Sequence, residues 1–264
     1  MRSRAPGRIV LFALVPLLAL TLSVEPAGAQ IVNIESILAG EPSPGVEGAL
    51  SAGFDLSRGN SRARRLDGNG LVRWRRGDLI LQLVAGGAYS EAGGVKVAEN
   101  ALGHLRLGWQ TSRILRLEAL LQVQQDTFIR LHRRVLTGAG LRLALYEGEK
   151  GVPGDRRLDA GLILMHEEER LRDRPRPDPR WRVSVLLSTS WVLNETVEVG
   201  AQVYLQPLLD EPGDHRVLGD AGIMVRLLGP LSLQVQARVV HDSRPPTGVE
   251  PTDLTLRNVL GITF

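Results

Sequence analysis

The sequence predicts an all-β protein, an antiparallel transmembrane β-barrel of about 12 strands with both termini in the periplasm. Apolar and polar residues alternate in most segments, which is the period expected of strands that separate two environments. The chain also ends in such a strand, 253–264, whose apolar face closes on the terminal Phe264. At the N-terminus, basic residues are followed by an apolar run and then by small residues, and this order predicts export.

The N-terminal segment has the order of a secretory signal peptide. Three arginines precede an apolar run over 9–24, and Ala27-Gly28-Ala29 supplies the small residues of a cleavage site. The alternative, a retained membrane helix, is disfavoured because the run is short and Pro16 interrupts it. We therefore expect 1–29 to be removed, 30–45 to form a periplasmic lead-in, and 46–264 to form the outer-membrane barrel of a Gram-negative cell.

Composition removes several functional classes. The chain has no Cys, so disulfides, thiolate metal sites and cysteine nucleophiles are excluded. The full chain has 32 Lys+Arg and 29 Asp+Glu, and removal of 1–29, with three Arg and one Glu, leaves 29 and 28. The remaining chain is therefore almost neutral, which indicates no nucleic-acid partner. We predict no cofactor, and the scattered His residues predict no metal site. No later segment has the roughly 18 apolar residues of a spanning helix, so membrane residence requires a closed barrel.

Six strands are predicted in the first half of the barrel. In the first, Leu50 and Phe54 oppose Ser51 and Asp55, and the others repeat this alternation, the second least regularly. Turn-forming residues punctuate them. In order, the strands and the connections that follow are 46–57 with Arg58-Gly59-Asn60, 64–75 with Arg76-Gly77-Asp78, 79–89 with a loop over 91–99, 100–110 with Thr111-Ser112-Arg113, 115–124, and 131–146 with 147–155.

Six further strands complete the predicted barrel. The charged, Pro-rich segment 167–180 is expected to be a loop because proline interrupts a strand ladder. In order, the strands and their connections are 158–164 with the loop 167–180, 181–191 with Leu193-Asn194-Glu195, 197–205 with a loop over 206–215, 217–227 with Leu228-Gly229-Pro230, 231–239 with a loop over 242–252, and 253–264.

Connection lengths predict the orientation. Short turns follow every second strand, and longer loops fall on the alternate connections, apart from exceptions at 58–61 and 147–155. Outer-membrane barrels keep their short turns in the periplasm, which places both termini there. The alternative is a soluble periplasmic β-sandwich that binds a ligand. The barrel is favoured because no strand is fully apolar, although the aromatic content of 4% is low for two interfacial girdles.

The polar face of the barrel predicts a non-enzymatic, structural or narrow-pore protein. Its charges have both signs, so we expect them to pair into a plug of salt bridges and hydrogen bonds. An open, porin-like pore with an anion preference is the alternative, given the arginine excess. The lumen-lining candidates are Arg106, Arg116, Glu118, Arg134, Arg142, Asp159, Arg182, Glu198, Arg226, Arg238 and Arg257.

One residue pair raises an enzymatic alternative, an outer-membrane lipid hydrolase. His241 and Ser243 stand two apart on a strand, so both side chains point the same way and could act as base and nucleophile. The pair resembles that of outer-membrane phospholipases and lipid A deacylases. In the phospholipase pattern Asn-Gly follows, whereas Arg244-Pro245 follows here. The simpler interpretation is a solvated His before a turn-forming Asp-Ser.

The expected partners are components of the outer membrane. The strand that ends on Phe264 resembles the C-terminal signature that the barrel-assembly machinery is thought to read. Outer-membrane lipids would surround the barrel, and arginines in 170–176 could meet lipopolysaccharide phosphates. The acidic run 167–169 could bind a divalent cation, but a solvated charge run is the default. The sequence leaves the oligomeric state open.

Two short motifs add a family resemblance. They are Leu56-Ser57-Arg58-Gly59-Asn60-Ser61, a turn after the first strand, and Arg133-Arg134-Val135-Leu136-Thr137-Gly138-Ala139-Gly140-Leu141, a strand near mid-chain. Together they resemble the salt-induced outer-membrane protein family, number 481 among the domains of unknown function, over about Val46 to Phe264. The resemblance implies an outer-membrane barrel with a link to salt response. It supplies no catalytic residues.

Overall fold

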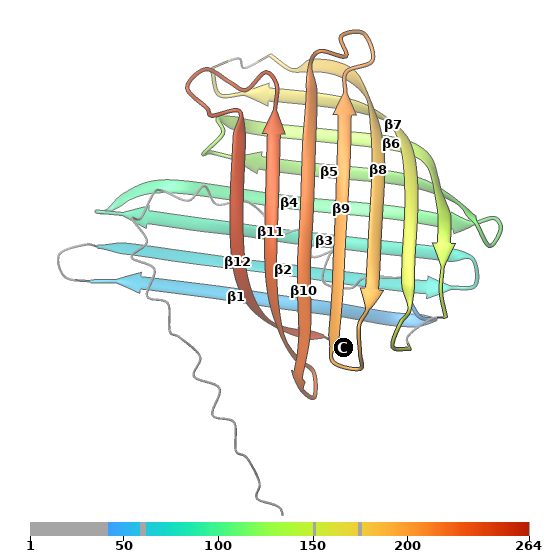
Figure 1. Ribbon diagram of the computed structural model, residues 1–264. Coiled ribbons are helices and arrows are strands. Elements are labelled where there is room, and N and C mark those ends of the chain that lie inside the picture. The colour runs from blue at the N-terminus through green and yellow to red at the C-terminus, as the bar shows by residue number, and fades with distance from the viewer. Residues whose placement is uncertain (1–41, 59–61, 150–151, 174–175, 264) are drawn as a thin grey trace, which may run out of the picture.

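The computed structural model describes residues 42–58, 62–149, 152–173 and 176–263, which form twelve strands in one closed antiparallel barrel (Figure 1). This confirms the predicted fold class. The predicted signal peptide, most of the lead-in and Phe264 lie outside the described residues. The strands are β1 (Gly45–Ser57), β2 (Ala63–Arg76), β3 (Leu79–Ala92), β4 (Val95–Gln110), β5 (Leu115–Asp126), β6 (Leu131–Glu147), β7 (Arg156–Leu171), β8 (Asp178–Val192), β9 (Val197–Pro207), β10 (His215–Leu228), β11 (Leu231–Asp242) and β12 (Thr252–Thr263).

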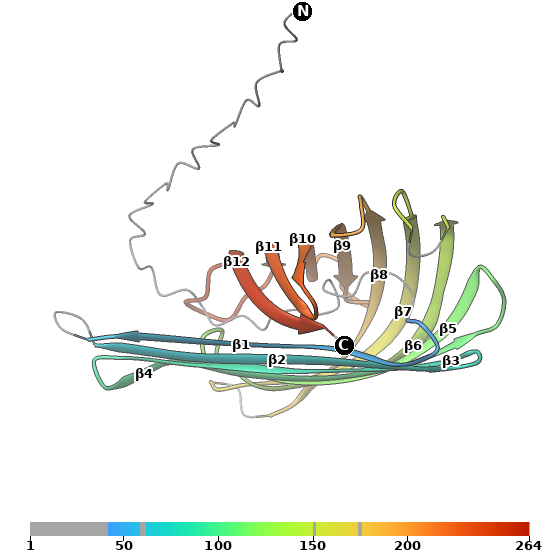
Figure 2. The same cartoon turned by 90° about the horizontal axis from the view of Figure 1, so that it is seen from below.

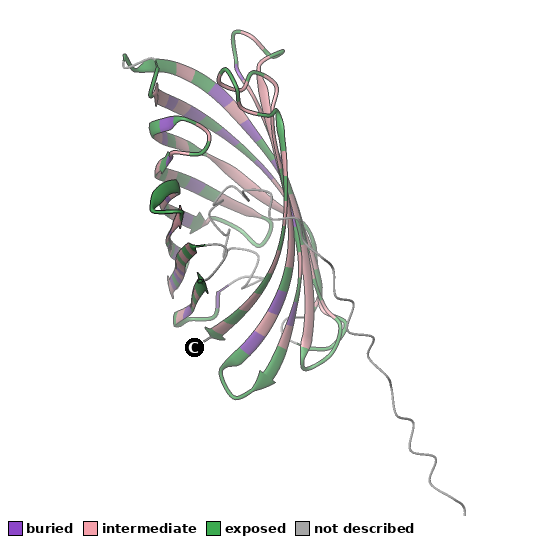
Figure 3. Ribbon diagram, turned by 90° about the vertical axis from the view of Figure 1, so that its left-hand side faces the viewer, coloured by how far each residue is buried: buried purple, intermediate pink, exposed green. Residues whose placement is uncertain are grey.

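The strands separate an apolar outer face from a polar inner face. On β5, Leu117 is 42% exposed, whereas the adjacent Glu118 is only 5% exposed. Successive side chains of a strand point to opposite faces, so this alternation recurs along the wall (Figure 3). Among the described residues, no helix is long and apolar enough to cross a bilayer.

The two ends of the barrel are distinguished by their connections. We call the end at which β1 begins and β12 ends the base, and the opposite end the rim. The base holds the two-residue turns Gly77–Asp78 and Gly229–Pro230, and the rim holds the nine-residue connection 243–251 between β11 and β12. Two connections depart from this pattern: the base connection between β6 and β7 is long, as the sequence predicts, and the rim connection between β3 and β4 is only two residues.

The predicted loop over 91–99 is wrong. β3 continues to Ala92 and β4 begins at Val95, so only Gly93 and Gly94 turn the chain, with φ of 59° and 83°. Glycine reaches positive φ without a steric penalty, which suits a two-residue hairpin turn. The glycine pair and the charged residues around it indicate a loop in the sequence, although Val95 and Val97 continue the alternation and are 68% and 39% exposed on the outer face.

The predicted charged loop 167–180 is also wrong. β7 continues to Leu171 and β8 begins at Asp178, with Pro179 tolerated near the rim end of β8. The acidic run therefore belongs to a strand, and Glu167 and Glu169 share its inner face. Inner-facing carboxylates are tolerated here because arginines on neighbouring strands meet them inside the barrel.

An apolar contact crosses the interior in the base half. Ala49 on β1, Leu71 on β2 and Val84 on β3 are each no more than 2% exposed, and they cluster with Met224 on β10. In the closed sheet order, β11 and β12 separate β10 from β1. Apolar side chains of strands that are not neighbours therefore pack together at this level of the interior.

The seam between β1 and β12 is much shorter than the other strand pairings. β1 pairs with β2 along its whole length, but with β12 at only three positions, Ala49 to Thr263, Leu50 to Ile262 and Ser51 to Gly261. β12 approaches β1 only near the C-terminal end of the described chain (Figure 2). Toward the rim the two strands separate.

Candidate functional site: the ion-paired interior

The base half of the interior contains one carboxylate shared by three arginines, which we call the base cluster. Glu118 on β5 lies 2.8 Å from Arg142 Nε on β6 and accepts a hydrogen bond from Arg116 Nε at 3.0 Å. Arg106 Nη1 on β4 lies 4.0 Å from the same carboxylate. Gly108 on β4 leaves room for this arrangement, because a Cβ there would lie 2.9 Å from Arg116 Cδ. The cluster thus holds three positive charges against one negative charge.

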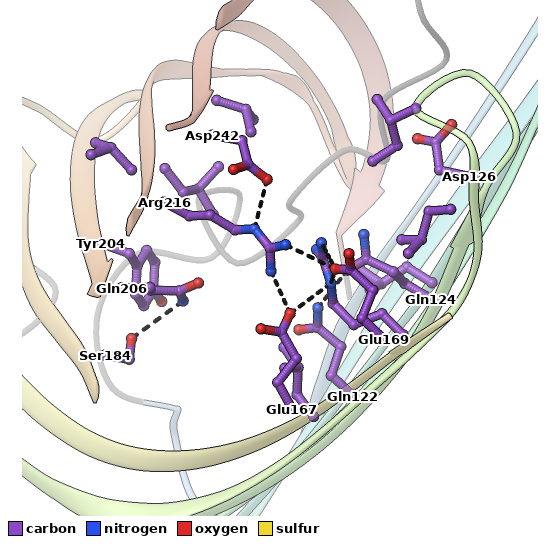
Figure 4. A pocket seen from close by; sticks show the side chains of 18 of the residues that line it. Gln122, Gln124, Asp126, Glu167, Glu169, Ser184, Tyr204, Gln206, Arg216 and Asp242 are labelled. Carbon is purple, nitrogen blue, oxygen red and sulfur yellow. Dashed lines mark hydrogen bonds and ion pairs between the residues drawn. The ribbon is translucent and has the colours of Figure 1, made fainter. Parts of the chain in front are cut away.

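The rim half contains a larger set of ion pairs, the rim network, centred on Glu167 and Glu169 of β7 (Figure 4). Arg134 on β6 contacts Glu167 at 2.9 Å and Glu169 at 2.5 Å. Arg182 on β8 also binds Glu167. Arg216 on β10 binds both carboxylates from across the interior, and lies 2.8 Å from Glu169.

The rim network continues onto β11 and into a rim connection. Arg216 Nε donates to Asp242 Oδ2 at 2.9 Å, and Arg182 Nη2 lies 2.9 Å from Asp214 in the β9–β10 connection. Glu167 and Arg182 are 2% and 3% exposed. Buried charges need partners of opposite sign and hydrogen bonds, and these residues supply both to one another. The network therefore joins strands β6, β7, β8, β10 and β11 from the inside.

A cavity of about 250 Å³ lies beside the rim network. Leu136 and Met165 give it an apolar wall, while Gln206, whose amide donates to Ser184 Oγ at 3.3 Å, lies on the polar side. The β11–β12 connection, with three prolines, lines it toward the rim. The cavity is smaller than the roughly 300–1,000 Å³ of sites for drug-sized ligands.

The structure gives each lumen-lining candidate a partner of opposite charge. Arg106, Arg116 and Arg142 share Glu118, and Arg134 and Arg182 belong to the rim network. The remaining pairs are Asp159 with Arg157 at 2.7 Å, Glu198 with Arg226 at 3.7 Å, Arg238 with Asp220 at 3.6 Å, and Arg257 with Asp67 at 3.0 Å.

Sequence reasoning missed the residues at the centre of the rim network. The sequence pattern places Glu167 and Glu169 in a loop, and Arg216 just outside a predicted strand. The spacing of two between the glutamates was the available signal, because it puts both carboxylates on one face of a strand. Glu168, between them, faces outward and pairs with Arg133 at 3.5 Å.

The two candidate catalytic residues have separate structural partners. His241 Nδ1 lies 2.8 Å from Thr252 Oγ1. Ser243 Oγ accepts from the main-chain N–H of His215 at 2.8 Å and donates to the carbonyl of Gly213 at 3.1 Å. None of these contacts joins His241 to Ser243. The serine hydroxyl ties two rim connections together. Elsewhere in the described chain, no three potential ligands are arranged around a metal position.

The family comparison decides the classification. The family model described as "Protein of unknown function, DUF481" matches residues 50–264. The chain belongs to this family. A search of curated proteins finds no significant match.

Several solved outer-membrane barrels are similar to this DUF481 member at low identity. The NanC porin is 6% identical, with a TM-score of 0.48, and the alignment covers 83% of this chain and 98% of the porin. The KdgM porin is 7% identical, with a TM-score of 0.41 and the same coverage. The translocator domain of the autotransporter NalP from Neisseria meningitidis is 10% identical, with a TM-score of 0.43, covering 88% of this chain and 91% of the domain.

Proposed function

We propose that this DUF481 protein is a non-enzymatic outer-membrane barrel with a structural role, whose interior is closed to solutes by its own side chains. The observation that carries the proposal is the bridge from Arg216 on β10 to Glu167 and Glu169 on β7. It crosses the interior, and in the base half Met224 clusters with apolar side chains of β1–β3. Breaking the bridge would leave buried charges without partners, which is costly.

Membrane residence is supported by the outer surface. Aliphatic side chains such as Leu187 and Leu256 are 49% and 73% exposed, and hydrocarbon is the solvent that accommodates them on a barrel wall. We place the base in the periplasm and the rim outside, after export directed by 1–29. Lipopolysaccharide would then surround the rim, and the assembly machinery would read the strand that ends at Phe264. The proposed link to salt or osmotic stress rests on the family resemblance alone.

A narrow anion-preferring pore is the second candidate. The base cluster favours it, because Arg106, Arg116 and Arg142 outnumber Glu118. A ring of arginines lowers the energy of an anion in a pore. This candidate requires the rim network to open.

Solute uptake by vesicles distinguishes the two candidates. The chain from residue 30 to 264 is refolded into vesicles, and a mobility difference between unheated and heated samples on a gel shows that the barrel has formed. Vesicle swelling is then followed in isotonic solutions of small sugars and of potassium chloride. We expect swelling no faster than in protein-free vesicles. Rapid swelling in the salt alone would support the anion pore, and rapid swelling in both would contradict a closed interior.

A further inference from the structure

Two arginines lie directly opposite each other on the outer wall of the barrel near the rim. Arg133 on β6 pairs with Arg170 on β7 in the sheet register. Both side chains face outward, because the adjacent Arg134 and Glu169 face inward and contact each other there. Like charges that stand directly opposite each other in a sheet destabilise it. A negative charge beside this pair would remove the repulsion.

Arg170 has no such partner within the described part of the chain. Its guanidinium makes no ion pair with those residues, and its Nε is buried without a hydrogen-bond acceptor. A buried N–H that lacks an acceptor costs the desolvation penalty of that group. An anionic acceptor supplied from outside the chain would offset this cost and the repulsion between the two arginines together.

Arg133 has only a weak partner. Its Nη2 lies 3.5 Å from Glu168 Oε1, and the two side chains are 51% and 40% exposed. Exposed ion pairs contribute little to stability. Each guanidinium carries five N–H donors, so Arg133 retains donors for a second acceptor. On this part of the outer wall, two guanidiniums therefore face one carboxylate, and positive charge is in excess.

The outer wall changes from apolar through aromatic to basic along β7. Leu162 and Leu164 are exposed on the outer face. Next toward the rim, His166 forms an edge-on ring pair with Trp181 of β8, with centroids 5.1 Å apart. Aromatic side chains on the outer face of a barrel mark the interface of the bilayer. Arg170 lies four residues beyond His166, roughly 13 Å along the strand, at the level of lipid head groups.

We propose that Arg133 and Arg170 bind a phosphate group of lipopolysaccharide. The phosphate lies between the two guanidiniums, which are suited to bidentate contacts with its oxygens. The acyl chains of the same molecule follow the outer wall past Trp181 and Leu164. The site rests on the proposed orientation, because a rim outside the cell places the arginine pair in the outer leaflet, where lipopolysaccharide is the phosphorylated lipid.

Native mass spectrometry of the refolded chain, residues 30 to 264, tests the site. The barrel is held in a detergent without phosphate, and lipid A, the phosphorylated anchor of lipopolysaccharide, is titrated into it. Arg170→Gln should raise the Kd for lipid A about tenfold, as expected for loss of charge-assisted hydrogen bonds. Arg64→Gln is the matched control and should leave the Kd unchanged. Arg64 also faces outward near the rim, but it already pairs with Glu91 at 2.6 Å.

The outcomes separate the site from the proposed membrane barrel. Unheated and heated samples of each variant are first compared on a gel. A chain whose mobility does not depend on heating would overturn the membrane barrel and the site with it. A heat-modifiable chain in which Arg170→Gln and Arg64→Gln bind lipid A equally well would overturn the site alone.

Two further lipids identify the bound group. Lipid A without its phosphates should bind about tenfold more weakly than lipid A, and Arg170→Gln should not weaken it further. Phosphatidylglycerol, whose phosphate is a diester with a single charge, should also bind more weakly than lipid A. Undiminished binding of dephosphorylated lipid A would overturn the phosphate contact, and equal binding of phosphatidylglycerol would overturn the assignment to lipopolysaccharide.

Glu168→Gln should change the affinity in the opposite direction. This substitution removes the carboxylate that competes with the phosphate for Arg133. Because the exposed pair is worth at most about 1 kcal/mol, lipid A should bind up to about fivefold more tightly. A purely structural role of the arginine pair would not produce this gain, and weaker binding of lipid A to Glu168→Gln would contradict the site.

Discussion

Arg216 Nη2 lies 2.8 Å from Glu169 Oε2, although two strands, β8 and β9, separate β10 from β7 in the sheet. The same guanidinium binds Glu167 and donates to Asp242 Oδ2 at 2.9 Å. One arginine thus ties three strands together through the interior. The barrel is held closed by these ion pairs as well as by its backbone hydrogen bonds. Breaking the ion pairs should therefore also lower the stability of the strand pairings.

Loss of the Glu167 charge should destabilise the barrel strongly. Glu167→Gln leaves Arg134, Arg182 and Arg216 facing a neutral amide, and removing one partner of a buried ion pair costs about 3–5 kcal/mol. We expect a correspondingly lower free energy of unfolding in urea, followed by the loss of the heat-dependent gel shift. Glu168→Gln is the matched control. Its pair with Arg133 is exposed, so the change should cost less than about 1 kcal/mol. Equal effects of the two substitutions would contradict the role of the network.

Gly140 should be intolerant of any side chain. A Cβ at this position on β6 would lie 2.6 Å from Ile163 Cα on β7, where the two backbones approach. Forcing a methyl group into such a contact typically costs about 1–3 kcal/mol. Gly103→Ala is the control, because a Cβ there has no atom within 4 Å. Urea unfolding should show a clear loss for Gly140→Ala and a change within about 0.5 kcal/mol for Gly103→Ala.

Ser243 should stabilise the rim connections and should not catalyse ester hydrolysis. Ser243→Ala removes the hydrogen bonds to His215 N–H and the Gly213 carbonyl, worth about 0.5–1.5 kcal/mol each. We expect faster proteolysis within 208–214, with no change in the background rate of phospholipid hydrolysis by the purified barrel. A hydrolysis rate above background that Ser243→Ala abolishes would establish the lipid hydrolase instead.

A pH-dependent contact joins two rim connections. Arg244 lies 2.6 Å from Glu211, and its hydrogen bond holds the pKa of Glu211 below the ordinary value. A carboxyl with a lowered folded-state pKa stabilises the fold above its unfolded pKa, and this contribution is lost as the pH falls through the folded pKa. Hydrogen exchange over 208–214, corrected for the intrinsic rate, should therefore increase in acid. Glu211→Gln should show the faster exchange already at neutral pH, and Glu250→Gln should not.

The sequence was sufficient for the fold because each strand carries its own period of two. Leu117 and Glu118 show this, because Leu117 needs an apolar environment outside the barrel, whereas Glu118 needs positively charged partners inside it. Strand number and face assignments follow from that pattern. Strand ends do not, because a glycine pair such as Gly93-Gly94, with charged residues around it, indicates a longer loop than the two-residue turn that the structure has.

The ion-pair partners could not be predicted from the sequence. Arg216 and Glu167 are 49 positions apart, and only closure of the sheet brings them together. The alternation therefore predicts that Arg134 and Arg182 line the lumen but does not identify the carboxylates that they bind. The sequence also does not predict the short pairing between β1 and β12, because 253–264 alternates in the same way as the fully paired strands.

The most direct test of a closed interior is the planar-bilayer conductance of the refolded chain, measured on a sample whose unheated and heated forms migrate differently. We predict a heat-modifiable protein that produces no reproducible conductance steps, because the rim network and the Met224 contact both cross the interior. Reproducible steps from the same heat-modifiable sample would contradict this account and show that the ion pairs line an open pore.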